Sequence, residues 1–230
     1  MADFGSTNTT RRSLLGGAVV AAGLLALPLP ALAAGTKDPA LAAVRSLLAH
    51  ASKGAFAALS ANEGFWNSSV ARISLSVLYG QPGALPPGVL SSSAFREDLQ
   101  HRLNGFAQAG LARAARAVSR KIAGLKVADP AAVLSGGPTA ATSQLRQDAG
   151  PAVVNAMTPS LLRALVKAKD PVVEQAVHAL KGVTYRDVAQ SLSNAAESAI
   201  WYQLGAEEAA IRRDPQATGD AALIAGLKRG

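Results

Sequence analysis

The chain has no cysteine, and that absence excludes several kinds of chemistry. No disulfide, thiolate-held metal, cysteine nucleophile or lipid-modified cysteine can form without a thiol. The three histidines, His50, His101 and His178, are isolated from one another and show no zinc-ligand spacing. A Gly-x-Ser-x-Gly nucleophile elbow and a phosphate-binding loop are also missing from the sequence. We therefore expect neither a metal nor a cofactor.

Aromatic residues are scarce as well, at 4% of the chain, so Ala, Leu and Val must fill the core. This composition favours closely packed helices over a sheet, where aromatic and β-branched residues are usually enriched. A length of 230 residues is enough to bury a core and fits one principal domain.

Charge is absent from residues 13–36, which follow the pair Arg11-Arg12. The run is long enough to span a bilayer. Its glycines and prolines weaken a helix, however, and it ends in Ala31-Leu32-Ala33, a small-x-small pattern read by signal peptidases. The preceding segment, residues 10–15 (Thr-Arg-Arg-Ser-Leu-Leu), resembles the bacterial twin-arginine export signal.

These features predict a twin-arginine-type signal peptide over residues 1–33 and a mature domain over residues 34–230. The protein is then expected in the periplasm or outside the cell. An ordinary Sec signal and a retained membrane anchor are the alternatives.

Helix start and stop signals recur along the mature chain. Asp-Pro pairs and threonines predict helix starts, and Gly or Pro predicts the ends. One helical region is expected from Ser93 onward, with a buried stripe from Leu103 to Leu125. With this region as the second in chain order, the other expected helices are 39–59, 130–135, 140–149, 171–181 and 185–213. Gly150-Pro151 is expected to end the fourth of these, and Thr158-Pro159 to make a kink or a fresh start.

Residues 70–90 are the least helical part of the chain. Ile73, Leu75 and Val77 alternate with serines, which predicts a short strand or an extended segment, and a Gly- and Pro-rich loop follows. The fold class predicted overall is all-α, a compact multi-helix, bundle-like single domain with this one irregular segment.

Two stretches carry the most specific sequence pattern. They are Leu134-Ser135-Gly136-Gly137 with Ala140-Ala141-Thr142, and Glu207-Glu208-Ala209-Ala210-Ile211-Arg212-Arg213-Asp214-Pro215. Both resemble motifs of a bacterial family, domain of unknown function 4197, and the resemblance extends over roughly residues 40 to 230. It implies an exported, mostly helical bacterial protein and implies no activity. Residues 143–145 depart from the family, which usually has an aromatic here.

The family motifs supply one candidate site: Gly136, Gly137, Thr142, Glu207, Glu208, Arg212 and Asp214. The Gly-Gly turn can direct backbone N–H groups at an anion, although a C-cap followed by an N-cap is the simpler interpretation. The adjacent glutamates can act as an acid–base pair only if they face each other, which neighbouring helical residues do not. Glu208 stands four residues before Arg212, so a helix-surface ion pair is favoured.

A second candidate site is a basic helix face formed by Arg102, Arg113, Arg116 and Arg120. These arginines fall opposite the apolar stripe, and no acidic residue lies between Asp98 and Asp129. Anionic membrane surfaces or an acidic envelope protein suit such a face. Nucleic acid is not expected outside the inner membrane. A solvated face that only keeps the protein soluble is the alternative.

Two functions follow from these sites. The favoured one is a non-catalytic envelope protein that binds a partner, a membrane surface or an apolar ligand among its helices. The other is an enzyme whose site joins the Gly136-Gly137 turn to the Glu207–Asp214 segment. A pocket between those two segments favours the enzyme, and a filled core with only the basic face left over favours the binding protein.

Overall fold

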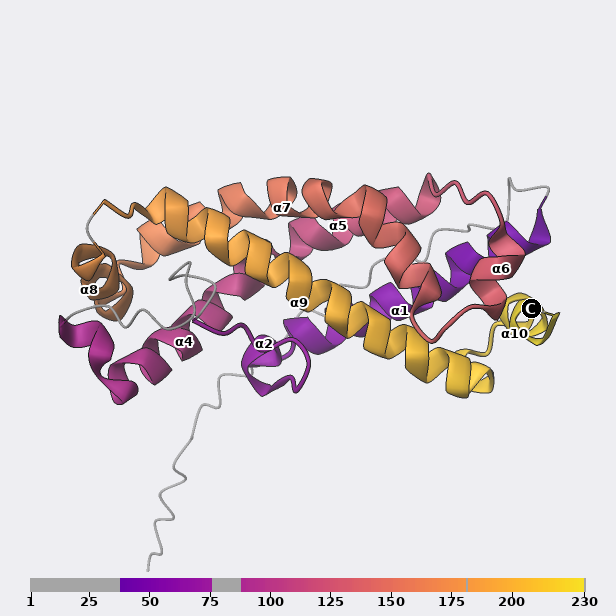
Figure 1. Cartoon of the computed structure of the whole chain (residues 1–230), viewed down its shortest axis with the longest axis horizontal. Helices are drawn as coiled ribbons and strands as arrows, with labels where there is room; N and C mark the ends of the chain where they lie inside the picture. The colour runs from indigo at the N-terminus through magenta and orange to yellow at the C-terminus, as the bar shows by residue number, and fades with distance from the viewer. Residues whose placement is uncertain (1–37, 76–87, 181, 230) are drawn as a thin grey trace, which may run out of the picture.

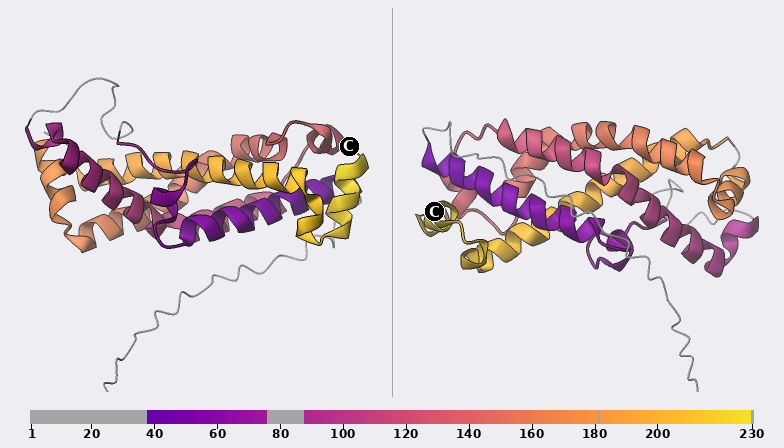
Figure 2. Two further views of the ribbon diagram at one scale, coloured as in Figure 1. Left: turned by 90° about the horizontal axis from the view of Figure 1, so that it is seen from below. Right: turned by 180° about the vertical axis from the view of Figure 1, so that it is seen from behind.

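In the computed structural model, which describes residues 38–75, 88–180 and 182–229, two long helices set the length of the molecule (Figure 1). These are α7 (Ala140–Ala168) and α9 (Tyr185–Arg213), which pack against each other in opposite directions. On their other side lie α1 (Pro39–Ser60) and α5 (Leu111–Ala123), which are nearer the viewer in the right-hand view of Figure 2. The predicted signal peptide lies outside the described residues.

Shorter elements complete the two ends of this bundle. They are α2 (Gly64–Asn67), η1 (Gly88–Ser91), α4 (Ser93–Ala107), η2 (Gln108–Gly110), α6 (Pro130–Ser135), α8 (Pro171–Ala179), η3 (Pro215–Thr218) and α10 (Ala221–Arg229). The helices α4 and α8 lie at one end of the molecule, and α6 and α10 lie at the other (Figure 1). The described residues contain no strand, and the predicted all-α fold is confirmed.

Local start signals place most of the helices as predicted. Asp38, Asp129 and Asp170 each accept hydrogen bonds from the first turn of the helix that they precede, and proline follows each of them. Thr184 and Asp187 form the predicted capping box of α9. These caps satisfy N–H groups that have no partner within the helix, and they need no tertiary contact to do so.

The prediction that Gly150-Pro151 ends a helix is wrong. The helix α7 continues through Pro151 and Pro159 to Ala168. An interior proline costs roughly 3 kcal/mol or more. Buried side chains recur on both sides of each proline, and this one apolar face packs against α5 and α9: Leu145, Ala149, Val153, Met157, Leu161 and Leu165. Burial of that continuous face offsets the hydrogen bonds that the prolines remove.

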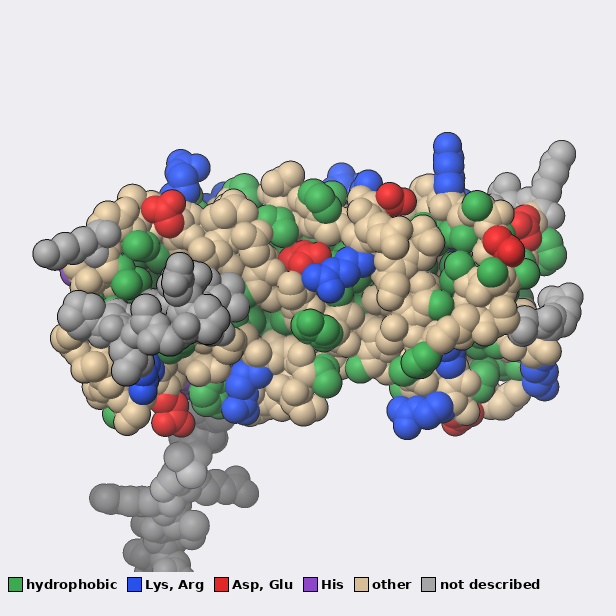
Figure 3. Space-filling view, viewed as in Figure 1, with side chains coloured by type: hydrophobic (Ala, Val, Ile, Leu, Met, Phe, Trp, Pro, Cys, Tyr) green, Lys and Arg blue, Asp and Glu red, His purple; other side chains and the backbone are tan. Residues whose placement is uncertain are grey.

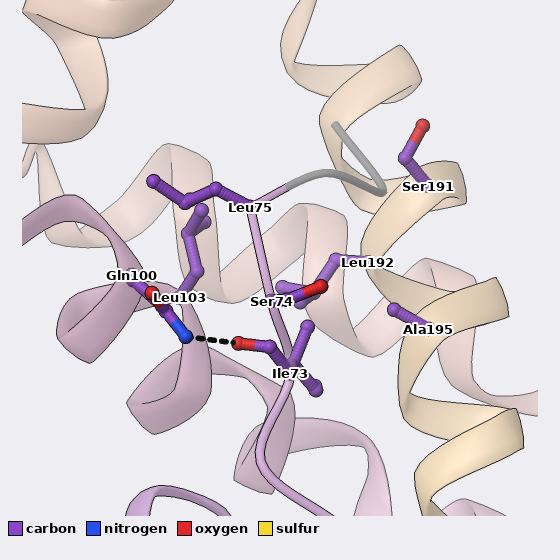
Figure 4. A pocket seen from close by; sticks show the side chains of 8 residues that line it. All are labelled: Ile73, Ser74, Leu75, Gln100, Leu103, Ser191, Leu192 and Ala195. Carbon is purple, nitrogen blue, oxygen red and sulfur yellow. Dashed lines mark hydrogen bonds between the residues drawn. The ribbon is translucent and has the colours of Figure 1, made fainter. Parts of the chain in front are cut away.

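The segment around Ile73 is held by side chains instead of by a partner strand. Asn104 of α4 accepts a hydrogen bond from the Ile73 N–H (2.8 Å) and donates one to the Ile73 carbonyl (2.9 Å). Gln100 donates to the same carbonyl, and the segment packs beside Leu192 of α9 (Figure 4). With its backbone groups satisfied in this way, Ile73 needs no neighbouring strand. Val77 lies outside the described residues.

The core is built mainly from Leu, Ala and Val, as the composition predicts. The predicted stripe from Leu103 to Leu125 is buried, and so is Trp201, whereas Tyr202 is 62% exposed. No helix in the described part of the chain has the length and apolarity needed to cross a membrane.

The last helix, α10, is fastened to α1 by Asp220. This carboxylate caps α10 through the backbone N–H groups of Ala222 and Leu223, and it accepts a hydrogen bond from Ser46 of α1. Partial burial raises the pKa of Asp220, but these hydrogen bonds and the neighbouring His50 outweigh it, so the pKa is lowered overall. The docked α10 forms one wall of the crevice described below.

Candidate functional site

Glu208 near the end of α9 is the centre of a buried polar cluster. Its side chain is fully buried. The carboxylate accepts hydrogen bonds from the N–H of Ala141 (3.0 Å) and of Thr142 (2.7 Å), in the first turn of α7. Thr139, predicted to cap this helix, occupies the N-cap position but makes no capping hydrogen bond with its side chain. The cap of α7 therefore comes from another helix.

Arg212 lies one turn after Glu208 and completes the cluster. Its Nε donates to Glu208 Oε1 (2.9 Å), and its two terminal nitrogens donate to the carbonyls of Leu134 (2.6 Å) and Val133 (2.9 Å) in α6. The pair predicted between Glu208 and Arg212 is present, but it is buried and not a helix-surface pair: the Arg212 side chain is only 11% exposed. We call Glu208 and Arg212 the α9 clamp.

The hydrogen bonds of the α9 clamp explain why its two charges can be buried between α6, α7 and α9. Removing two charges from water costs several kcal/mol per ion unless each charge is fully hydrogen-bonded. Glu208 receives two backbone N–H groups and a guanidinium, while Arg212 reaches two carbonyls at the end of α6. The positive end of the α7 dipole also favours the carboxylate.

The Gly136-Gly137 turn joins α6 to α7 over this cluster. The N–H groups that bind the Glu208 carboxylate belong to Ala141 and Thr142 of α7 and not to the two glycines of the turn. Gly136 is the C-cap of α6, which agrees with the simpler interpretation. Thr142 is buried in the same turn of α7.

Glu207 does not share a site with Glu208. It faces α1, where Gly54 leaves room for it: a Cβ at Gly54 would stand 2.6 Å from Glu207 Oε2. Its other oxygen accepts a hydrogen bond from Gln203 (3.2 Å). Asp214 ends α9 as its C-cap, before Pro215. The adjacent glutamates therefore point to different neighbours and form no acid–base pair.

An open crevice of about 410 Å³ lies beside the clamp. It is lined by the Gly136-Gly137 turn, Arg212, Pro215 and Lys228 of α10, so the two motif segments do meet at a space open to solvent. No Asp or Glu lines the crevice among the described residues. Glu208, which is paired with the lining residue Arg212, already accepts hydrogen bonds at both oxygens, which leaves it poorly suited to act as a base.

Comparison with known proteins identifies the family of the chain. The family described as "Protein of unknown function (DUF4197)" matches residues 35–225. The chain belongs to the DUF4197 family. No curated protein and no solved structure matches it. In this DUF4197 protein the two most specific motif segments are the ones that the α9 clamp ties together.

The basic face is smaller than predicted. Arg113, Arg116 and Arg120 are exposed on α5, and in the described residues they have no ion-pair partner. Arg102 belongs to α4, beyond the 3₁₀ turn η2, and it pairs with Asp98 (2.9 Å) and with Asp170 (2.7 Å). The hydrogen bonds that Arg102 donates to these two carboxylates raise its pKa. We therefore restrict the basic face to Arg113, Arg116 and Arg120.

The side of the molecule formed by α7 and α9 offers a contrast. On the face drawn in Figure 3, Lys and Arg side chains are scattered among Asp and Glu side chains. In the centre of the α7–α9 contact, Arg146 pairs with the mostly buried Glu197 (3.3 Å). This face has no cluster of like charges comparable to the three arginines of the basic face on α5.

Metal-binding groups are not assembled in the described part of the chain. Each histidine instead lies near one carboxylate: His50 near Asp220 (3.6 Å), His101 near Glu63 (2.6 Å) and His178 near Glu174 (3.8 Å). The Val133 and Leu134 carbonyls that Arg212 binds could not be predicted from the sequence, because every residue type has a backbone carbonyl.

Proposed function

We propose that this protein is an exported, non-catalytic envelope protein that binds anionic membrane surfaces through the basic face of α5. The observation that carries the proposal is the set of exposed, unpaired arginines Arg113, Arg116 and Arg120. The opposite side of α5, with Leu111, Val118 and others, is buried against α1 and α7.

The expected binding is weak and peripheral. Each cation near an anionic membrane contributes about 1 kcal/mol, so three cations supply only a few kcal/mol in favourable geometry. The helix α5 has no aromatic residue that could insert between lipids. Its apolar side is already used in the core, so electrostatic attraction must supply the binding, and salt must weaken it.

The chain from Ala34 should sediment with anionic vesicles but not with neutral ones at low salt. Replacing Arg113, Arg116 and Arg120 with Gln should remove most of this binding, because the three charges that face the membrane are lost. A matched variant with Gln at Arg163, Lys167 and Arg186, which are exposed on α7 and α9, loses the same net charge and should keep it. Equal sedimentation of all three proteins would show that the basic face does not bind membranes and serves solubility alone. Binding to an acidic envelope protein without binding to vesicles would show that the partner is a protein and not the membrane.

Export should depend on the arginine pair. A fusion of residues 1–40 to a reporter that must fold before translocation should reach the periplasm, because the twin-arginine route carries folded proteins. Replacing Arg11 and Arg12 with Lys should stop it. Continued export of the Lys variant would assign the Sec route instead, and membrane-bound reporter would indicate a retained anchor.

The alternative function is an enzyme whose site joins the Gly136-Gly137 turn to the Glu207–Asp214 segment. One observation favours it, the crevice beside Arg212. The orientations of Glu207 and Glu208 count against it. The former lies against Gly54, and the latter is held by α7 and Arg212. We therefore favour the binding protein.

A further inference from the structure

A second space in the molecule is apolar and lies at the opposite end from the clamp, between α4, α8 and α9. Its volume is about 130 Å³. Aliphatic side chains form most of its lining, and the deepest of these, Leu99, Leu103 and Val173, are each only 2% exposed. Protein interiors are normally packed with few voids larger than a water molecule. A space of this size beside buried Leu and Val side chains can therefore hold a small apolar group.

The size and lining limit what that occupant can be. Engineered apolar cavities of about 150 Å³ stay dry and bind molecules as small as benzene. Drug-sized ligands need sites of at least about 300 Å³. The small side chain of Ala176, which is 4% exposed, leaves space on the α8 side that a longer residue would fill. A short alkyl chain or a small ring fits these walls.

The polar groups of the pocket, Asp187 and Ser191, both come from α9. Thr184 donates two hydrogen bonds to one oxygen of Asp187, which lower the pKa of this carboxyl and keep it ionised at neutral pH. The other Asp187 oxygen and the Ser191 hydroxyl have no hydrogen-bond partner among the described residues.

Other carboxylates lie close by. Burial raises the pKa of Tyr185, the first residue of α9, and the nearby Glu174 and Asp170 raise it further. Arg102 pairs with Asp170, whereas His178 is the one ion-pair partner of Glu174 within the described residues. Arg186 lies beside Asp187 and offsets part of its charge. The three carboxylates Asp170, Glu174 and Asp187 still outnumber Arg102 and Arg186, and this negative balance favours a cationic head group over an anionic one.

We infer that the pocket between α4, α8 and α9 binds the short alkyl chain of an amphiphile whose ammonium group pairs with Asp187. The apolar walls take the chain, and the free oxygen of Asp187 takes the head group, with Ser191 as a second hydrogen-bond partner. This site is separate from the basic face of α5, and its ligand has the opposite charge to the one proposed there.

Hexylamine, hexan-1-ol and hexanoate are matched probes, since they share a six-carbon chain and differ in the head group. Each is titrated at pH 7 into the chain from Ala34, and binding is followed by the NMR signals of the Val173, Val177 and Leu99 methyl groups. Hexylamine should shift these signals with a dissociation constant about tenfold lower than that of hexanoate. Hexanol should lie between the two.

Two variants separate the roles of the walls and the head group. Ala176→Leu fills the space and should abolish the shifts, whereas Gln175→Leu, at an exposed position of the same helix, should leave them unchanged. Asp187→Asn should remove the preference for the amine while hexanol still binds. A stable Ala176→Leu protein that binds hexylamine normally would overturn the site, and an unchanged preference in Asp187→Asn would overturn the head-group assignment. Absence of binding to the parent would also overturn the proposal.

Discussion

Replacing Arg212 with Met should lower the free energy of unfolding by about 3–5 kcal/mol. The change leaves the Glu208 carboxylate fully buried without its cation, and it leaves the Val133 and Leu134 carbonyls without their donor. Met keeps much of the length of the side chain, so the loss reports on charge and hydrogen bonds more than on packing. Urea unfolding followed by circular dichroism measures the difference.

The neighbouring residues provide the matched controls. Arg213→Met removes the same charge from the same turn of α9, but Arg213 is exposed, so the change should stay within about 0.5 kcal/mol. Adding Glu208→Gln to Arg212→Met removes the unpaired buried charge, so the double variant should be less destabilised than the sum of the single variants. Similar losses for Arg212→Met and Arg213→Met would show that the α9 clamp does not stabilise the fold.

Asn104→Ala should cost about 2–3 kcal/mol, because it leaves the buried N–H of Ile73 without its acceptor. The same replacement removes the hydrogen bonds that Asn104 donates to the carbonyls of Ile73 and Gln100. The segment from Ile73 to Leu75 is itself in neither a helix nor a strand, so loss of structure should begin there. Amide hydrogen exchange in residues 72–75 should speed up more than exchange in α7 or α9.

Gln100→Ala is the matched test for this prediction. Gln100 donates to the same Ile73 carbonyl, but Asn104 still satisfies that carbonyl after the change. The expected cost is therefore smaller, about 1 kcal/mol. An Asn104→Ala protein with unchanged exchange at residues 72–75 would mean that packing against α9, and not the Asn104 amide, holds this segment.

Much of the fold follows from local sequence. The starts of α1, α6 and α8 lie at Asp-Pro pairs, and the start of α9 lies at its capping box, because a short polar side chain satisfies the first N–H groups without help from the rest of the chain. The apolar stripe from Leu103 to Leu125 predicted a buried face, because helical spacing alone places these residues on one side of a helix.

The sequence was less informative where one helix depends on another. The prolines of α7 predicted a break at residue 150, but only the packing of its apolar face on α5 and α9 makes an uninterrupted helix favourable. Helical spacing placed Arg102 on the basic face. Its pairing with Asp98 is local to α4, but its pairing with Asp170 depends on how distant parts of the chain pack together. Spacing along one helix contains no information on such partners.

The candidate site shows the same division. The sequence by itself determined the helical class, most helix starts, the family motifs and the pairing of Glu208 with Arg212, because each depends on residues within a few positions of one another. Only the tertiary structure decided that this pair is buried, that it caps α7 and binds α6, and that an apolar pocket remains beside Ala176. Burial, and the identity of a partner more than sixty residues away, arise when helices pack, and packing depends on the whole chain.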